Sequence, residues 1–144
     1  MPTRLTLLRI NQAVDLVTNI LINYANCGKT ISFTRLHDRL NKLISMDVSF
    51  DDFELVLAEV NKNSFVAKRV LITAIVFSAF GLPGGKFYQQ LLDRKLISFF
   101  PPEDDQHARR TIAQNHKALM FAAYKNLPPP VQPLANKHTP PILF

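Results

Sequence analysis

The chain has 144 residues, 47% of them hydrophobic, which is enough to build the core of one domain. Its 17 Lys and Arg residues outnumber its 11 Asp and Glu residues, and the net charge of +6 favours a polyanionic partner without requiring one. The single cysteine, Cys27, excludes an internal disulfide and a cysteine-rich zinc site, and this usage is typical of a cytoplasmic protein.

The amino-terminal segment is apolar enough to resemble an export signal, but polar residues interrupt it and no small-residue cleavage site follows. Its apolar residues instead recur at steps of three and four, which predicts an amphipathic helix from about Asn11. The residues of this stripe are Ile10, Val14, Val17, Leu21 and Tyr24. Gly28 is expected to end the helix in a left-handed conformation, and residues 30–32 are expected to be briefly extended.

Two more helices are predicted in the first half of the chain. Ser32 or Thr34 should cap the first and Ser49 the second, with a short connection at residues 44–48. The second of these helices should end within residues 61–64. The apolar faces are formed by Phe33, Leu36, Leu40 and Leu43 in one helix and by Phe53, Val56, Leu57 and Val60 in the other.

The longest nearly unbroken apolar run, VLITAIVFSAF, begins at Val70. It is rich in β-branched residues and ends at a Gly/Pro cluster, so residues 70–77 are predicted to be a β-strand buried on both faces. At about a dozen residues the run is too short to span a membrane, which takes ~20 residues. The glycines that follow should make a tight turn, after which residues 86–94 are expected to form a short helix.

The last predicted helix follows an apolar stretch at residues 97–100 that is compatible with an extended conformation. Pro101 and Pro102, followed by three acidic residues, signal the start of this helix, which should reach about Lys125. Beyond it the composition changes, because the end of the chain holds six of the ten prolines. Such a segment is expected to be an extended arm and not a helix or a central strand.

These elements predict an α+β, mostly helical fold with a winged helix-turn-helix-like core, a C-terminal helix and a Pro-rich tail. The order helix, short extended segment, helix, turn, helix and strand is the order of a winged-helix domain. The expected organisation is a winged-helix-like domain at residues 1–100, a helix packed on it at 101–126 and a Pro-rich extended arm at 127–144.

Three short motifs add to this expectation: SFTRLH at residues 32–37, LITAIV at 71–76 and GLPGGKFY at 81–88. With them, residues 31–88 resemble a family of small prokaryotic and phage-borne winged-helix-like proteins, whose pattern is roughly TY-ELA-RL, LLSAVV and G-PG-GFF. Lys86 departs from that pattern, which tends to have glycine before the aromatic pair. The resemblance implies the fold and a bacterial or phage origin, and it carries no activity.

Charge is distributed unevenly over the predicted helix-turn-helix. Residues 50–62, the helix that would enter the major groove, carry four acidic residues and one basic residue. Because carboxylates oppose contact with phosphates, base reading by this helix is not expected. Sequence-independent phosphate contacts are expected instead from Arg35, Arg39, Lys42, Lys68, Arg69 and Lys86, with Arg109, Arg110 and Lys117 as further contributors. The same charges are also compatible with an ordinary solvated surface.

The sequence offers no recognisable catalytic or metal site. GLPGGK lacks the first glycine and the Ser or Thr of a phosphate-binding loop, because Phe80 and Phe87 stand at those positions. None of the four histidines has metal-ligand spacing, and no serine lies in a nucleophile-elbow motif. His107 follows Asp104 by one helical turn, but acidic residues at a helix start usually serve as caps. We therefore expect a non-enzymatic protein without a metal or cofactor.

Two functions remain. The first is a small basic protein of a bacterium, phage or mobile element that binds DNA or RNA through phosphate contacts. The second is a protein-interaction module, an adaptor, inhibitor or homo-oligomer, that uses the acidic third helix and the Pro-rich arm. Its partner-binding residues would be Asp51, Asp52, Glu54, Ile142, Leu143 and Phe144. Neither function requires a membrane.

Overall fold

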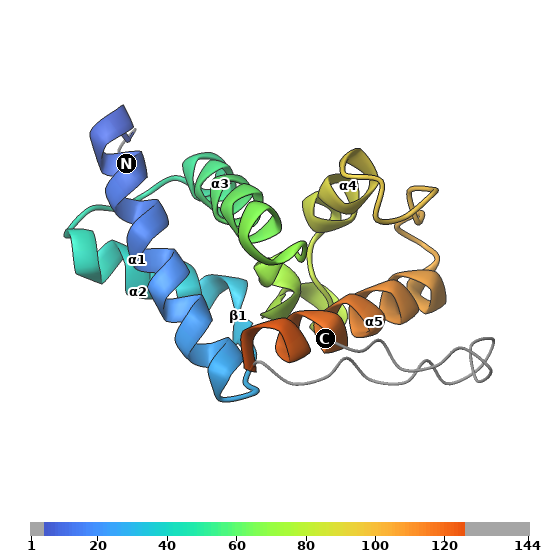
Figure 1. Ribbon diagram of the computed structural model, residues 1–144. Helices are drawn as coiled ribbons and strands as arrows, with labels where there is room; N and C mark the ends of the chain where they lie inside the picture. The colour runs from blue at the N-terminus through green and yellow to red at the C-terminus, as the bar shows by residue number, and fades with distance from the viewer. Residues whose placement is uncertain (1–4, 126–144) are drawn as a thin grey trace.

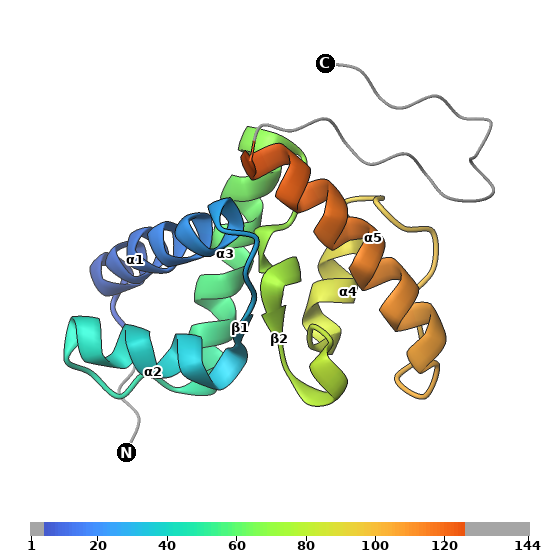
Figure 2. The same cartoon turned by 90° about the horizontal axis from the view of Figure 1, so that it is seen from below.

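The computed structural model describes residues 5–125, which form a mostly helical α+β fold with one small parallel sheet (Figure 1). Figure 2 shows α1 and α2 on one side of the short strands and α4 and α5 on the other. The elements in chain order are α1 (Leu7–Asn26), β1 (Ile31–Ser32), α2 (Phe33–Ile44), α3 (Phe50–Lys68), the 3₁₀ helix η1 (Ile72–Ile75), β2 (Val76–Phe77), the 3₁₀ helix η2 (Ala79–Gly81), α4 (Gly85–Asp93) and α5 (Gln106–Lys125). The mostly helical α+β class expected from the sequence is confirmed.

The first three helices begin at small polar residues. Thr6, Ser32 and Ser49 are the N-caps of α1, α2 and α3, and each side-chain oxygen accepts a hydrogen bond from a backbone N–H three residues later. Gly28 follows α1 with a left-handed φ of 68°. The predicted caps Ser32 and Ser49 and the left-handed glycine are therefore confirmed, whereas α1 begins earlier than the expected Asn11.

Two details of this helical unit differ from the prediction. α3 continues to Lys68 and does not end within residues 61–64. Asn61 and Ser64 in that range are buried against neighbouring elements, so they do not mark a solvent-exposed helix end. Leu43 is 53% exposed, and Ile44 takes the buried position at the end of α2.

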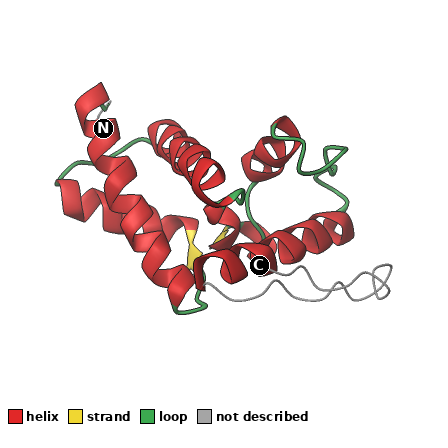
Figure 3. Ribbon diagram, in the orientation of Figure 1, coloured by secondary structure: helices red, strands yellow, loops and turns green. Residues whose placement is uncertain are grey.

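The segment expected to be a strand at residues 70–77 is buried but is mostly not a strand. It forms η1, and only Val76 and Phe77 belong to β2, which pairs in parallel with β1 (Figure 3). A strand needs a ladder partner for its backbone, and β1 offers only two residues. Burial and β-branched composition thus located the core correctly but predicted the wrong backbone conformation.

Three buried polar side chains take the place of the missing ladder. His116 from α5 and Ser64 and Asn61 from α3 accept hydrogen bonds from the successive backbone N–H groups of residues 71–73. The three donor–acceptor distances are 2.8, 3.1 and 3.1 Å. Ser64 Oγ also donates to the carbonyl oxygen of Val70 at 2.6 Å. These three residues, here called the polar clamp, fix the turn of chain between α3 and β2.

The two C-terminal helices build a second, smaller apolar cluster. Phe87, Tyr88 and Leu91 of α4 are buried in it, together with Ala113 of α5. Burial raises the pKa of Tyr88 to about 12, so its hydroxyl stays protonated and donates to the carbonyl oxygen of Arg109 at 3.1 Å. Residues 97–100, in the connection between the two helices, form no strand.

The C-terminal helix α5 lies against elements that precede it in the chain. α5 packs against α1 and η1, and it contributes residues to both apolar clusters. No β-hairpin follows α3 in residues 5–125, and the two strands are parallel, so the winged-helix core is not confirmed. The division at residues 100 and 126 stays a prediction, and the proposed arm at 127–144 lies outside the described residues.

Candidate functional site

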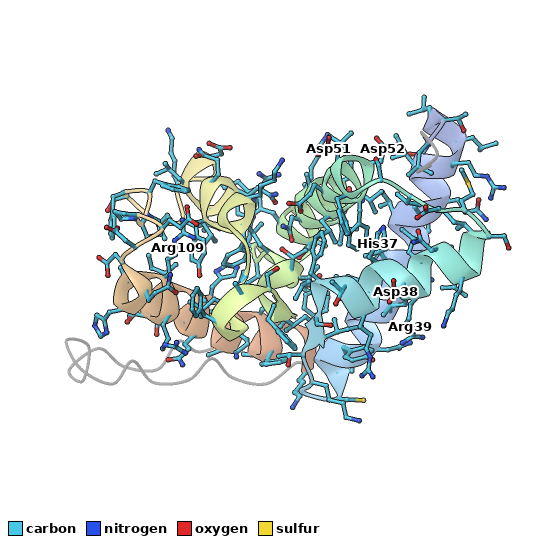
Figure 4. The ribbon with its side chains drawn as sticks, turned by 180° about the vertical axis from the view of Figure 1, so that it is seen from behind. His37, Asp38, Arg39, Asp51, Asp52 and Arg109 are labelled. Carbon is cyan, nitrogen blue, oxygen red and sulfur yellow. The ribbon has the colours of Figure 1, made fainter. Side chains whose placement is uncertain are left out.

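α2 has one apolar face and one basic face. The apolar face is buried, whereas Arg35, Arg39 and Lys42 are exposed. Their spacing of four and three residues places them along one side of the helix. Figure 4 shows Asp38 and Arg39 on the outer side of α2. Asp38 lowers the local charge, but the bases outnumber it three to one on this surface. We call Arg35, Arg39 and Lys42 the basic face.

Contacts at the end of α2 hold this helix in place. His37 Nε2 lies 2.7 Å from the carbonyl oxygen of Val48, which can only accept, so this nitrogen carries a proton. Asn41 Oδ1 accepts a hydrogen bond from the N–H of Val48 at 3.0 Å. The rings of Phe50 and Phe53 pack on the imidazole with centroid distances of 4.8 and 5.2 Å. The basic face is therefore built on a well-anchored helix.

The basic side chains have no acidic partners within the part of the chain that the structure describes. No Lys or Arg of residues 5–125 forms an ion pair with a carboxylate of that range, and the one charged-group contact joins His37 Nδ1 to Asp38 Oδ1 at 4.0 Å. A cation that is not paired inside its own fold can be paired by an external anion without first breaking a salt bridge.

Two of the other expected phosphate-contacting residues lie elsewhere. Lys68 and Arg69 are at the end of α3, which Figure 2 places across the molecule from α2. The Lys68 ammonium lies 5.8 Å from the centre of the Tyr124 ring, and the Arg69 guanidinium lies 5.2 Å from that of Phe65. These two cations thus contact aromatic rings of their own fold and do not extend the basic face.

Lys86, the last of the six residues expected to contact phosphate, lines a cavity of about 240 Å³. This cavity lies between the starts of α2 and α4 and the middle of α3. Glu54 lines the same cavity, and burial raises the pKa of its carboxyl while the Lys86 charge opposes that rise. Asn61 Nδ2 donates to Thr73 Oγ1 and Gln90 Oε1 at 2.7 and 2.6 Å, so the polar lining is largely satisfied by itself. With one carboxylate and one ammonium, this cavity has little net attraction for phosphate.

The acidic residues expected to hold a protein partner are also divided. Asp51 is exposed, whereas Asp52 is 4% exposed and its Oδ2 accepts a hydrogen bond from the N–H of Leu5 at 2.9 Å (Figure 4). Asp52 therefore ties the beginning of the chain to α3 and is not accessible to a partner. Glu54 is half-buried in the cavity described above. The other expected partner residues, Ile142, Leu143 and Phe144, lie outside the described residues.

Sequence analysis missed the polar clamp and the burial of Arg109. Asn61 and Ser64 continue the spacing of the buried positions of α3, and a polar residue on a core-facing stripe was the available signal. Arg109 was expected to be a surface base adding to phosphate contacts, but it is 8% exposed. Its burial depends on the chain segment before α5, which local patterns do not place.

Metal sites and membrane-spanning helices are both absent from residues 5–125. Residues 5–125 contain no group of three or more His, Cys, Asp and Glu side chains arranged to hold a metal ion. None of the helices within those limits is long and apolar enough to cross a membrane. Comparisons with protein-family models, curated proteins and solved structures found no match to this chain. The family resemblance of residues 31–88 thus stays a prediction, and a proposed function depends on the geometry alone.

Proposed function

We propose that this chain is a small, non-enzymatic protein that binds the phosphate backbone of DNA or RNA through the basic face of α2. The observation that carries the proposal is the exposed row of Arg35, Arg39 and Lys42, which has no carboxylate ion partner in residues 5–125. Arg and Lys at such spacing can each neutralise one phosphate and release its counterions. The exposed thiol of Cys27 is in keeping with action in a reducing cytoplasm.

The sequence predicts a helix-turn-helix formed by α2 and α3, and the surface that we propose for contact is the first of these two helices. α3, which would enter the major groove in such a motif, exposes the carboxylates of Asp51 and Glu59. These charges would repel phosphates on either side of the groove. We therefore expect binding with little sequence preference.

The magnitude of the salt dependence follows from the number of contacts. Three phosphate contacts on duplex DNA give a slope of log affinity against log salt of about −2.7. Between about 50 and 200 mM salt, the affinity should then fall roughly fortyfold. A much steeper slope would mean that Lys68, Arg69 or Lys86 also contacts phosphate.

The test is fluorescence anisotropy with a random DNA duplex and a random single-stranded RNA at several salt concentrations. Replacing Arg35, Arg39 and Lys42 together by glutamine should abolish most of the binding and flatten the salt slope. A control in which Lys29, Lys62 and Lys125 are replaced by glutamine has the same net charge and also changes only exposed residues. It should keep most of the affinity and the slope. Absence of binding at low salt, or an equal loss in both triple variants, would contradict the proposal.

A protein-interaction function is the second candidate, because apolar side chains are exposed where α1 and α3 begin. Leu7 and Leu8 are exposed at the start of α1, and Phe50 is exposed at the start of α3. The hydrogen bond between Leu5 and Asp52 brings these two helix starts together. Exposed apolar residues that gather in one place are typical of an interaction surface.

Sedimentation velocity over a range of protein concentrations tests this candidate. If the apolar surface joins two copies, replacing Leu7 and Phe50 by serine should remove the dimer. The exposed Val66, which lies near the other end of α3, provides a matched control as Val66→Ser. A monomer at every concentration would rule out the homo-oligomer.

A further inference from the structure

α5 carries a second row of basic residues. Arg110 and Lys117, which the sequence analysis named as further phosphate contacts, line one cavity together with Gln114 and so lie on one side of α5. The steps of four and three residues along this row are the same as those from Arg35 to Lys42 in α2. No carboxylate of residues 5–125 forms an ion pair with either base of α5. The fold therefore has two basic rows, one on α2 and one on α5.

The segment at residues 74–83 lies between the two basic rows. Figure 2 shows the short strands between α2 and α5. A cavity of about 300 Å³ lies between residues 77–79 and the start of α2. A second cavity, of about 150 Å³, lies between the same segment and α5, and its lining includes Arg110 and Lys117. Phe77 lines both cavities, so a chain that runs from one basic row to the other passes this ring.

Phe80 is a second aromatic residue of this segment, and its backbone is strained. Its φ of 61° is left-handed, a conformation that is unfavourable for a residue other than glycine. The side chain is 73% exposed, so burial does not compensate for this strain. Its neighbours in the chain line the two cavities, Ala79 the first and Gly81 the second. A strained residue without a packing role points to a function for the exposed ring.

Basic rows with aromatic rings between them match the chemistry of a single-stranded nucleic acid. The phosphates of a single strand attract Arg and Lys, and its unpaired bases are free to stack on aromatic rings. The bases of a duplex are already paired and stacked on one another, so they cannot reach such rings. The larger cavity has about ten times the volume that one water molecule occupies in the liquid, which is room for one base beside Phe77.

Glu103 limits where the phosphates of such a strand can lie. It is exposed, and it lines a separate cavity of about 160 Å³ together with Phe80. Its carboxylate repels a phosphate but not an uncharged base. The two cavities that share Phe77 have no Asp or Glu among the described residues of their linings. We therefore expect the phosphates to lie near Phe77 and a base to contact Phe80.

We propose that this surface binds single-stranded DNA or RNA in preference to duplex. The inference rests on the proposed nucleic-acid function and names its substrate class. The phosphates of one strand contact the basic face of α2 and then Arg110 and Lys117 of α5. Unpaired bases between these contacts stack on Phe77 and Phe80.

Fluorescence anisotropy at one salt concentration compares three probes of about 12 nucleotides, a length within the site sizes of single-strand binding folds. The probes are oligodeoxythymidine, the same backbone with abasic sites in place of its bases, and a duplex of mixed sequence. Oligodeoxythymidine should bind at least about fivefold more tightly than either of the others, because it alone offers free bases for stacking. Equal affinity for oligodeoxythymidine and the abasic strand would overturn the inference, because phosphates alone would then account for binding.

The salt dependence counts the phosphate contacts. Five contacts on a single strand give a slope of log affinity against log salt of about −3.5. Replacing Arg110 and Lys117 by glutamine leaves three contacts, so the slope should become about −2.1. Replacing the exposed Lys62 and Lys95 by glutamine changes the net charge equally and should keep the original slope. An unchanged slope in the variant of α5 would refute a path from α2 to α5.

Substitution of the two rings tests the stacking. Phe77→Leu and Phe80→Leu keep an apolar side chain without an aromatic face, and each should lower the affinity for oligodeoxythymidine about fivefold while leaving the affinity for duplex unchanged. Phe80→Trp should retain the affinity, and Phe99→Leu, at another exposed ring, is the control. Because Phe80 is exposed, its variants test the stacking even if Phe77→Leu does not fold. Unchanged affinity in Phe80→Leu would refute the stacking.

The same measurements separate this inference from the proposed function. If duplex binds and oligodeoxythymidine binds no more tightly, backbone binding by α2 stands and the preference for single strands is refuted. If no probe binds at low salt, both are refuted. Oligodeoxyuridine and oligouridine differ only in the 2′-hydroxyl group, so the tighter of the two identifies DNA or RNA as the natural strand, and either result supports the inference.

Discussion

Replacing His116 by glutamine should remove an acid-sensitive component of the stability of this fold. The imidazole is buried, its Nε2 accepts the N–H of Leu71 at 2.8 Å, and the Phe87 ring packs on it at a centroid distance of 5.8 Å. Burial lowers the pKa of His116 from 6.5 to about 4. Protonation would convert the accepting nitrogen into a donor, so the charged form cannot keep the bond to Leu71.

The size of the effect follows from the difference between the two states. Between pH 6.5 and about 4, the unfolded chain binds a proton at His116 and the folded chain does not. The stability supplied by the neutral imidazole is therefore complete above pH 6.5 and is lost as the pH falls through this window. The full depression corresponds to about 3 kcal/mol, of which about 2 kcal/mol should be lost between pH 7 and pH 5.

Urea unfolding followed by circular dichroism at about pH 7, 6 and 5 measures this loss. His116→Gln offers an acceptor oxygen that does not titrate in this range. Between pH 7 and pH 5, the free energy of unfolding of the unchanged protein should therefore fall by about 2 kcal/mol more than that of His116→Gln. His107, exposed on the same helix, provides the control variant His107→Gln, which should keep the pH dependence of the unchanged protein. Parallel pH profiles for the unchanged protein and His116→Gln would refute the buried, neutral imidazole.

Three further substitutions test individual contacts by thermal or urea unfolding. Asn61→Ala should lower the free energy of unfolding by about 2 kcal/mol, because it leaves the buried N–H of Thr73 without an acceptor. The control Asn63→Ala changes an exposed residue and should have little effect. Tyr124→Phe removes a hydroxyl that donates to the polar clamp at 3.1 Å and should cost about 1 kcal/mol, and an unchanged midpoint would show that this bond is dispensable. Phe80 is exposed with a left-handed φ of 61°, so Phe80→Gly should stabilise the fold by about 1 kcal/mol, and a clear loss would mean that the ring has a packing role.

The features that could be predicted correctly are those whose conformation depends on residues close by in the sequence. Ser32 and Ser49 cap their helices through a bond to an N–H three residues away, and Gly28 adopts a conformation that few other residues tolerate. The stripe that buries Leu36 and Leu40 leaves Arg39 on the opposite side by geometry alone. The basic face of α2 could therefore be predicted without knowing the rest of the fold.

The segment at residues 70–77 shows where local patterns fail. Its composition is that of a buried strand, and six consecutive residues from Leu71 to Val76 are buried. Whether such a segment becomes a strand depends on a partner strand, and this partner is too short to pair with most of it. Asn61 and Ser64 instead satisfy the backbone from the neighbouring helix, a solution that requires α3 to continue past the polar residues that seemed to end it.

The polar side chains buried in this fold follow the same rule as its backbone, because an unpaired polar group in a core is costly. Side-chain nitrogen and oxygen atoms that are fully buried in residues 5–125 have hydrogen-bond partners, with Gln106 Oε1 as the exception. The polar clamp shows that this chain can pair polar groups deep in its core, because Ser64 alone makes bonds to two backbone groups and to Tyr124. Polar side chains in this core therefore stabilise the fold by pairing with groups from other elements, and local sequence patterns do not identify those partners.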